Sequence, residues 1–167
     1  MVLVGLMGAG KTTIGKALAR KTGWRFVDSD HEIENRTGVT IPVIFEIEGE
    51  SGFRQRETKV IAELLREPNI ILATGGGAVL SPENRQTIRD CGTVCYLKAA
   101  PKTLYQRTRH DRSRPLLQVA DPMAVLASLL DIRGPLYEEI ADIVIDVERN
   151  TSSQIVERLS KEDLFTC

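Results

Sequence analysis

Residues Gly5 to Thr12 follow the pattern G-x-x-x-x-G-K-T, which is typical of loops that bind phosphate. The apolar run Val2–Val4 precedes this loop, and an amphipathic helical pattern follows it. A glycine turn between a strand and a helix directs several N–H groups and the positive end of the helix dipole at one point. The sequence therefore predicts an anion-binding site where this helix begins.

Two side chains of the loop have predicted tasks. Lys11 can reach the terminal phosphates of a nucleotide, and the Thr12 hydroxyl can bind Mg²⁺. Glycines are needed because side chains would keep the backbone from closing on a phosphate. The predicted nucleotide-binding residues of this segment are Gly8, Ala9, Gly10, Lys11, Thr12 and Thr13.

Beyond the loop, predicted strands and helices alternate. Further apolar runs of strand length lie at residues 24–27, 70–73, 94–97 and 143–145. Helical patterns lie at residues 14–22, 33–37, 42–67, 82–89, 122–132, 135–141 and 152–159, and another begins at residue 101. Such alternation is typical of an α/β fold with a central parallel sheet, here of about five strands, and helices on both faces. Because ligands bind beyond the carboxyl ends of such strands, we expect the site at that edge.

The 167 residues suffice for one well-buried core but not for two ordinary domains. The formal net charge of −1 gives no general excess of positive charge for nucleic acid or an anionic membrane. No apolar stretch reaches the roughly 18 residues of a membrane span, and no signal-peptide pattern is present. The three cysteines and two histidines lack the spacing of a disulfide framework or a zinc site. We therefore expect a cytoplasmic protein that works as a monomer.

Asp28 and Asp30 lie two residues apart at the end of the second predicted strand. If the extended geometry persists, both carboxylates point toward the ligand edge, where one could hold Mg²⁺ through water and the other accept from a substrate hydroxyl. The alternative is that they only end the strand and cap the next helix. Because the third predicted strand runs into Thr74 and glycines rather than an acid, Asp28 is the better metal candidate.

Arg54 and a run of three glycines are candidates for binding a substrate. The guanidinium of Arg54 suits a carboxylate, and Glu57 lies one turn further on, where it can orient the fork, although an exposed arginine is the commoner case. Gly75, Gly76 and Gly77 lose more conformational entropy than a plain turn requires, which indicates close approach of a ligand. A tight strand-to-helix connection is the alternative.

An arginine-rich stretch without periodicity lies between residues 107 and 114, and its arginines are Arg107, Arg109, Arg112 and Arg114. We interpret this stretch as part of a lid that brings positive charge onto a transferring phosphoryl group, with a solvated basic loop as the alternative. A nucleic-acid surface is disfavoured because no aromatic residues are interleaved for base stacking. Arg133, at the start of another predicted helix, is a second candidate for binding an anion.

Together these segments resemble the shikimate kinase family, whose members phosphorylate the 3-hydroxyl of shikimate with ATP. The resemblance spans nearly the whole chain and follows the family order through residues 5–13, 28–30, 44–54, 75–77, 107–117 and 133–137. It implies a P-loop NTPase fold of the nucleoside-monophosphate-kinase type. It also implies a single kinase domain over residues 1–167, with a substrate-binding insertion at about 30–60 and a mobile lid at about 108–121.

The resemblance assigns the acceptor side of the site. Asp30 would bind the shikimate hydroxyls and act as the base, and Gly76 would donate its N–H within the Gly75–Gly77 run. Arg54 and Arg133 would bind the shikimate carboxylate.

It also implies Mg²⁺ with ATP, held by Thr12 directly and by Asp28 through the water shell of the metal. The catalytic residues would be Lys11, Asp30 and Arg114. The ATP-binding residues outside the P-loop would be Arg107, Arg114 and Arg149.

Two other functions share parts of this pattern. Another small-molecule P-loop kinase, such as a gluconate or nucleoside monophosphate kinase, would also have the loop and the lid, but the paired arginines with a triple glycine favour a carboxylated polyol. A nucleotide-dependent switch is suggested only by the D-x-x-G match at residues 131–134, which comes late in the chain without an N-K-x-D motif. We interpret that match as coincidence.

Overall fold

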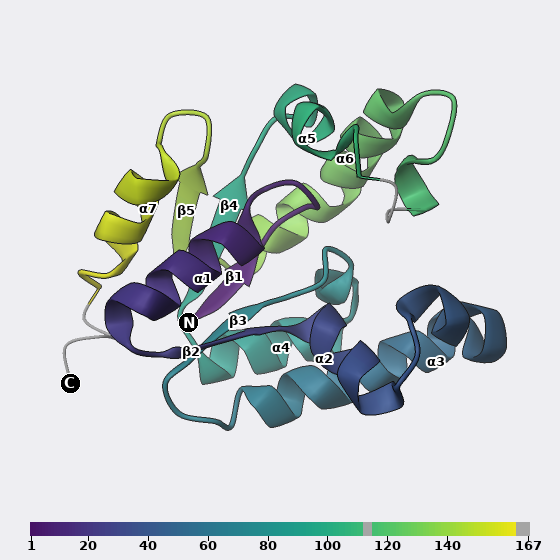
Figure 1. The fold of residues 1–167 in the computed structure, drawn as a ribbon, viewed down its shortest axis with the longest axis horizontal. Coiled ribbons are helices and arrows are strands. Elements are labelled where there is room, and N and C mark those ends of the chain that lie inside the picture. Colours follow the sequence, from purple (N-terminus) through teal and green to yellow (C-terminus); the bar gives the residue numbers. More distant parts are fainter. Residues whose placement is uncertain (112–114, 163–167) are drawn as a thin grey trace.

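Five short runs of mostly apolar residues pair side by side in one parallel sheet, as the computed structural model shows for residues 1–111 and 115–162 (Figure 1). The strands are β1 (Val2–Val4), β2 (Arg25–Asp28), β3 (Ile70–Ala73), β4 (Val94–Lys98) and β5 (Ile143–Asp146). Their order across the sheet is β2-β3-β1-β4-β5, and every neighbouring pair is parallel. The predicted α/β fold is confirmed.

Helices cover both faces of the sheet. They are α1 (Lys11–Thr22), α2 (Ser29–Thr37), α3 (Ile41–Leu64), α4 (Pro82–Cys91), α5 (Pro101–Thr108), α6 (Pro122–Ile140) and α7 (Ser152–Leu159). In Figure 1, α1 and α7 lie side by side in front of the sheet, and α4 lies behind it. None of these helices, within the part of the chain that the structure describes, has the length and apolar character to cross a membrane.

The central strands carry the core. Every residue of β1 and β3 is buried, which is why both read as continuous apolar runs rather than as alternating patterns. Because β1 and β3 are parallel neighbours, the glycine turns that follow them meet at one edge of the sheet. Asp28, at the end of β2, pairs with Ala73 of β3 and brings a third segment to this edge. Three distant parts of the chain are thus placed together by strand pairing.

One sequence prediction at this edge is wrong. Asp28 ends β2, but Ser29 already begins α2, so Asp28 and Asp30 do not share the face of one extended strand. Asp28 is the N-cap of α2, and its Oδ1 accepts a hydrogen bond from the Asp30 N–H at 3.1 Å. Aspartate is among the best N-cap residues, and this local bond competes successfully with continuation of the strand.

The predicted break between residues 132 and 135 is also wrong. Helix α6 runs without interruption through Pro135, so Arg133 lies inside a helix rather than at the start of one. Proline removes one backbone hydrogen bond from a helix. Here Leu126, Tyr137 and Ile140 are all buried, and we attribute the continuity of α6 to their packing.

Two boundaries also differ from prediction. Helix α5 extends to Thr108, so Arg107 is helical rather than part of a loop. Helix α3 is interrupted at Gly49, whose φ of 70° and ψ of −179° lie outside the helical region. The glycine allows the chain to change direction between the two parts of α3.

Candidate active site

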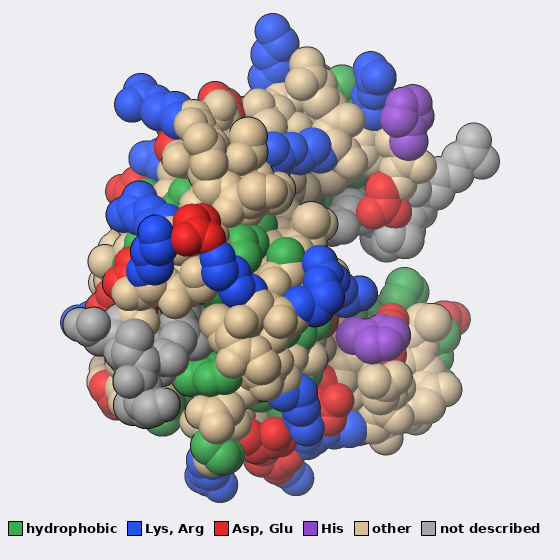
Figure 2. All heavy atoms as spheres, turned by 60° about the vertical axis from the view of Figure 1, so that its left-hand side comes forward, with side chains coloured by type: hydrophobic (Ala, Val, Ile, Leu, Met, Phe, Trp, Pro, Cys, Tyr) green, Lys and Arg blue, Asp and Glu red, His purple; other side chains and the backbone are tan. Residues whose placement is uncertain are grey.

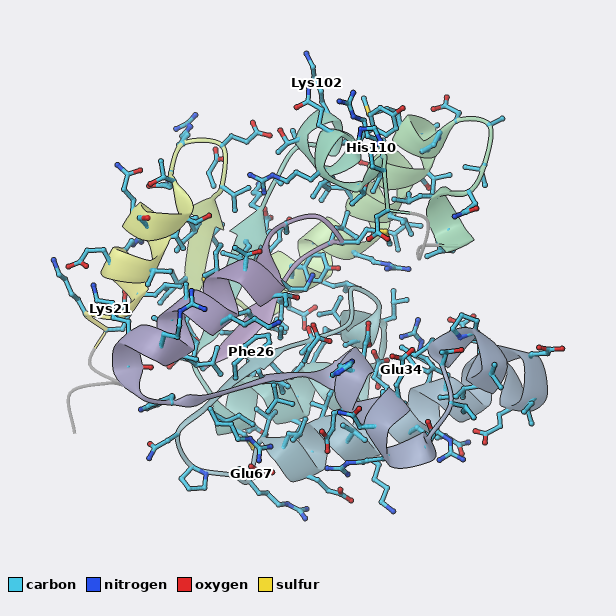
Figure 3. All side chains as sticks on the ribbon, in the orientation of Figure 1. Lys21, Phe26, Glu34, Glu67, Lys102 and His110 are labelled. Carbon is cyan, nitrogen blue, oxygen red and sulfur yellow. The ribbon has the colours of Figure 1, made fainter. Side chains whose placement is uncertain are left out.

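A cavity of about 1980 Å³ lies at the carboxyl edge of the sheet. Figure 2 shows the surface hollowed on one side, with Lys and Arg side chains beside the hollow. In Figure 3, Glu34 on α2 and His110 beyond α5 mark opposite sides of this region. The predicted site residues that line the cavity are Gly8–Thr13, Asp28, Asp30, Arg54, Gly75, Gly76, Gly77, Arg107 and Arg133.

The P-loop wraps the start of α1. Gly8 and Gly10 have φ values of 82° and 101°, which only glycine adopts without strain, and Gly10 is the N-cap of α1. Lys11 Nζ donates hydrogen bonds to the carbonyl oxygens of Gly5 at 2.7 Å and Leu6 at 3.0 Å. The ammonium group is therefore held over the loop whose N–H groups would surround a phosphate.

Arg107 adds a second positive charge to the loop from α5. Its Nη1 donates to the carbonyl oxygens of Gly8 at 3.3 Å and Ala9 at 3.4 Å. Arg114, the other predicted lid arginine, lies outside the described residues.

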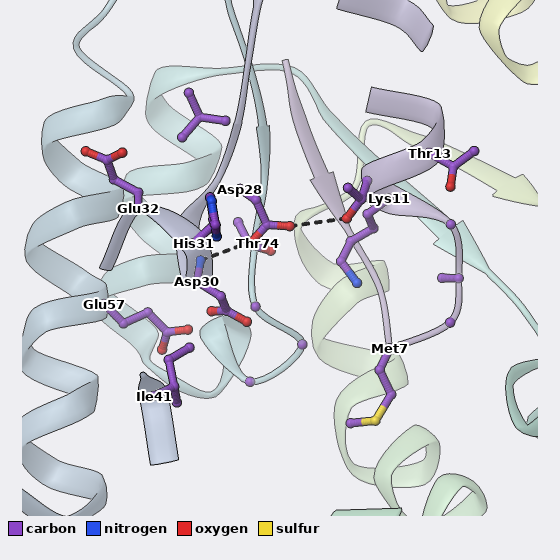
Figure 4. A pocket seen from close by; sticks show the side chains of 18 of the residues that line it. Met7, Lys11, Thr13, Asp28, Asp30, His31, Glu32, Ile41, Glu57 and Thr74 are labelled. Atoms are coloured by element: carbon purple, nitrogen blue, oxygen red, sulfur yellow. Dashed lines mark hydrogen bonds between the residues drawn. The ribbon is translucent and has the colours of Figure 1, made fainter. Parts of the chain in front are cut away.

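Thr12 and Asp28 are brought together across the cavity. Thr12 Oγ1 donates to Asp28 Oδ2 at 3.2 Å, as drawn in Figure 4. A hydroxyl and a carboxylate oxygen are the hard donors that Mg²⁺ prefers. The donor set therefore fits the predicted metal, although the described residues contain no cluster of three His, Cys, Asp or Glu side chains that could hold a metal ion.

The Asp30 carboxylate is poised to take up a proton. Burial, reinforced by the negative charge of Asp28, raises the pKa of Asp30 from 3.8 to about 6. The positive charges of Lys11 and Arg54 oppose this shift. A carboxylate with a pKa near the working pH is suited to general base catalysis.

Arg54 lies near Asp30 and is held by an ion pair with Glu57. Its Nη1 donates to Glu57 Oε2 at 2.6 Å, and its Nη2 lies 3.3 Å from Glu50 Oε1. The Glu57 side chain is only 1% exposed, and burial raises its pKa, which the adjacent Arg54 opposes. The remaining oxygen, Glu57 Oε1, is buried and has no hydrogen-bond partner among the described residues. Figure 4 shows Glu57 and Asp30 turned toward the same space.

The triple glycine is explained by side chains that pack on its backbone. A Cβ on Gly75 would lie 2.6 Å from Asp30 Oδ1, and a Cβ on Gly77 would lie 2.5 Å from Arg54 Nη2. The Gly75 N–H already donates to Ser29 Oγ at 3.0 Å, whereas those of Gly76 and Gly77 donate to no described residue. Two of the three N–H groups are therefore available to a ligand in the cavity.

Replacing Gly77 by alanine is expected to raise the KM for the acceptor substrate roughly 10-fold, because the added methyl group displaces Arg54 from Glu57. The backbone itself is not strained by alanine at this position, so the protein should fold. The matched control is Gly134→Ala in α6, where an added Cβ meets nothing closer than 3.7 Å. Steady-state kinetics of both variants test the effect, and equal KM values would contradict it.

Arg133 reaches the cavity from α6. It is 9% exposed, and its Nη1 lies 3.6 Å from the position that a Cβ on Gly76 would take. The two predicted carboxylate-binding arginines, Arg54 and Arg133, therefore flank the glycine run from different helices.

Among the predicted site residues that the structure describes, Arg149 is the one that does not line the cavity. Its side chain is 84% exposed and pairs with Asp146 at 3.2 Å. The next residue, Asn150, does line the cavity and donates to the Asp146 carbonyl oxygen at 2.9 Å.

Sequence reasoning missed three polar residues around the glycine run: Ser29, Thr74 and Tyr137. Ser29 anchors Gly75, Tyr137 donates to the Gly76 carbonyl oxygen at 2.5 Å, and the buried Thr74 Oγ1 has no partner among the described residues. Only Tyr137 offered a signal, since it lies one helical turn after Arg133.

Comparisons with known proteins show which family the chain is similar to. The sequence model described as shikimate kinase matches residues 7–163. The shikimate kinase of Dechloromonas aromatica is 59% identical over 160 residues, covering 96% of this chain and 87% of the relative. That of Nitrosococcus oceani is 60% identical over 162 residues, covering 97% of this chain and 83% of the relative.

A solved structure agrees. The shikimate kinase from Acinetobacter baumannii in complex with shikimate superposes with a TM-score of 0.92 at 47% identity, covering 99% of this chain and 92% of the other. These similarities favour the predicted family over the gluconate kinase and switch alternatives. The chain belongs to the shikimate kinase family.

Proposed function

We propose that this chain transfers the γ-phosphoryl group of ATP to the 3-hydroxyl of shikimate, giving shikimate 3-phosphate and ADP, as a step in the synthesis of chorismate and aromatic amino acids. One observation carries the proposal. A single cavity has a phosphate-binding loop on one side and a pair of arginines beside a carboxylate base on the other. This arrangement suits a polyphosphate and a carboxylated polyol bound face to face.

On the nucleotide side, the N–H groups of residues 8–13 would surround the phosphates, with Lys11 and Arg107 supplying positive charge. Mg²⁺, when bound, would neutralise charge on the phosphate oxygens. Thr12 would bind it directly and Asp28 would hold it through its water shell, with phosphates and water as the other ligands. Arg114 and Arg149 are retained as predicted ATP contacts.

On the acceptor side, Arg54 and Arg133 would bind the shikimate carboxylate. The N–H of Gly76, which donates to no described residue, would bind the substrate between them. Asp30 would orient the 3-hydroxyl. In the transfer, the hydroxyl oxygen forms a bond to the γ-phosphorus while the bond to the β,γ-bridging oxygen breaks. The hydroxyl proton passes to an Asp30 oxygen, and ADP leaves with the bridging oxygen.

The rate is expected to depend on the protonation of Asp30. Because the pKa of Asp30 is raised to about 6, the carboxylate form dominates above pH 6 and the inactive acid form dominates below it. The value of kcat/KM for shikimate should therefore be flat above about pH 7 and fall roughly tenfold per pH unit below about pH 5.5. A pH–rate profile measures this fall. A plateau extending to pH 4.5, with ATP still bound, would contradict the base assignment.

A coupled assay for ADP release tests the function itself. Purified protein is supplied with ATP and Mg²⁺, and shikimate, gluconate or a nucleoside monophosphate is added in turn. We expect turnover with shikimate alone, and phosphate on its 3-hydroxyl by NMR. Turnover with gluconate or a nucleotide but not with shikimate would overturn the proposal.

The organisation of the chain completes the proposal. Residues 1–167 would form one kinase domain, with about residues 30–60 as the substrate-binding insertion and about 108–121 as a lid. Helix α2 and the first part of α3 lie in that insertion. In this first part of α3, Ile41, Pro42 and Phe45 line the cavity. We also propose a cytoplasmic monomer whose partners are ATP and shikimate, with neither nucleic acid nor membrane, consistent with the net charge of −1.

A further inference from the structure

Tyr137 lies behind the substrate-binding wall of the cavity. Its side chain is fully buried on α6, and its ring packs against that of Tyr96 with centroids 5.0 Å apart. Burial raises the pKa of the Tyr137 phenol well above its usual value, so the hydroxyl keeps its proton. That hydroxyl donates to the Gly76 carbonyl oxygen at 2.5 Å. A buried core residue is thus bonded directly to the glycine run.

Three consecutive glycines have more backbone freedom than any other tripeptide, so their N–H groups point at a ligand only if something fixes them. Ser29 fixes the Gly75 N–H, and Tyr137 fixes the Gly76 carbonyl. In a trans peptide the carbonyl oxygen and the next N–H point in opposite directions. The bond from Tyr137 therefore turns the Gly77 N–H away from the buried ring.

Arg133 meets the same glycine. A Cβ on Gly76 would lie 3.6 Å from both Tyr137 Oη and Arg133 Nη1. The hydroxyl, the guanidinium and the Gly76 peptide therefore lie close together, although Gly76 and Arg133 are far apart in the sequence.

We propose that Tyr137 is a positioning residue for shikimate binding: through its hydroxyl it fixes the Gly76–Gly77 peptide beside Arg133, so that the Gly77 N–H and the carboxylate-binding arginine are presented together. This inference rests on the proposed function of the same cavity. Tyr137 does not line the cavity itself and acts only through these neighbours. Because the Tyr137 hydroxyl is bonded to the Gly76 carbonyl oxygen and not to the P-loop, nucleotide binding should be unaffected.

Tyr137→Phe tests the proposal, with Tyr96→Phe as the matched control. Each variant keeps the packed ring pair and loses one hydroxyl from a buried tyrosine, but only Tyr137 is bonded to Gly76. The KM for shikimate of Tyr137→Phe is expected to rise roughly 3- to 10-fold, the range for loss of one buried hydrogen bond. Its KM for ATP should stay within about twofold of the wild type, as should both constants for Tyr96→Phe.

Thermal unfolding midpoints establish that both variants are folded, and calorimetric titration of shikimate without nucleotide measures binding directly. The proposal is overturned if Tyr137→Phe binds shikimate as the wild type does, if both KM values rise together, or if Tyr96→Phe shows the same loss. Failure of the proposed function looks different, because the wild-type protein would then bind no shikimate at all.

Discussion

Asp30→Asn is expected to lower kcat by roughly 10²- to 10⁴-fold, the usual contribution of a positioned general base. Asparagine has nearly the same shape but cannot take the hydroxyl proton. The side chain lies beside Gly75 and asparagine keeps its size, so the Kd for ATP should change by less than about twofold. Single-turnover kinetics with excess enzyme separate the chemical step from substrate binding.

The same change is expected to stabilise the fold at neutral pH. An acid whose pKa is raised from 3.8 to about 6 binds its proton more tightly in the folded state than in the unfolded state. Its contribution to stability is therefore favourable below about pH 4 and is lost as the pH rises through 6. Asparagine removes this penalty, and the free energy of unfolding at pH 7.5 should rise by about 1–3 kcal/mol.

Asp90→Asn is the control for both measurements. Asp90 lies on α4 outside the cavity and accepts hydrogen bonds from Gln86 on the same helix. We expect neither kcat nor the stability of this variant to change by a measurable amount. Undiminished turnover of Asp30→Asn would remove Asp30 from the mechanism, and a less stable variant would contradict the cost assigned to its buried charge.

The second large effect concerns Arg54. Arg54→Ala is expected to raise the KM for shikimate by roughly 30- to 5000-fold, because truncating one partner of a buried ion pair costs about 2–5 kcal/mol. The loss has two sources. The substrate carboxylate loses a charged donor, and Glu57, with its side chain 1% exposed, is left as an unpaired negative charge in the wall of the cavity.

Arg56→Ala is the matched control, since Arg56 lies on the same helix and also forms a short ion pair. Its Nη2 lies 2.6 Å from Glu48 Oε1, but the side chain is 45% exposed and does not line the cavity. Exposed pairs contribute little, so this variant should keep its KM and kcat. The comparison separates the effect of losing Arg54 at the cavity from the effect of losing any arginine of α3. Equal kinetics of the two variants would contradict the assignment of Arg54.

Local signals made much of the fold predictable. The P-loop is recognisable because its chemistry lies within eight consecutive residues, and β3 because a strand buried on both faces is continuously apolar. Gly23 ends α1 with a φ of 77°, as expected for a helix C-cap.

What could not be predicted is non-local. The predicted break at Pro135 failed because buried side chains keep α6 helical, and no local pattern reveals what they pack against. The extended geometry assumed for Asp30 failed because capping by Asp28 and strand extension are both reasonable from sequence alone. The bond from Tyr137 to Gly76 joins residues 61 apart and has no sequence signature.

The order of the strands has a consequence for altering what this enzyme accepts. The nucleotide loop follows β1 and the Asp28–Asp30 segment follows β2, with β3 between them. Two steps across the sheet, each about 4.8 Å, therefore set the separation between the phosphate-binding loop and the Asp28–Asp30 segment. Interstrand spacing is the same in every sheet and cannot be widened by surface mutations, so acceptors of other sizes have to be accommodated by redesigning α3 rather than by moving the reacting groups apart.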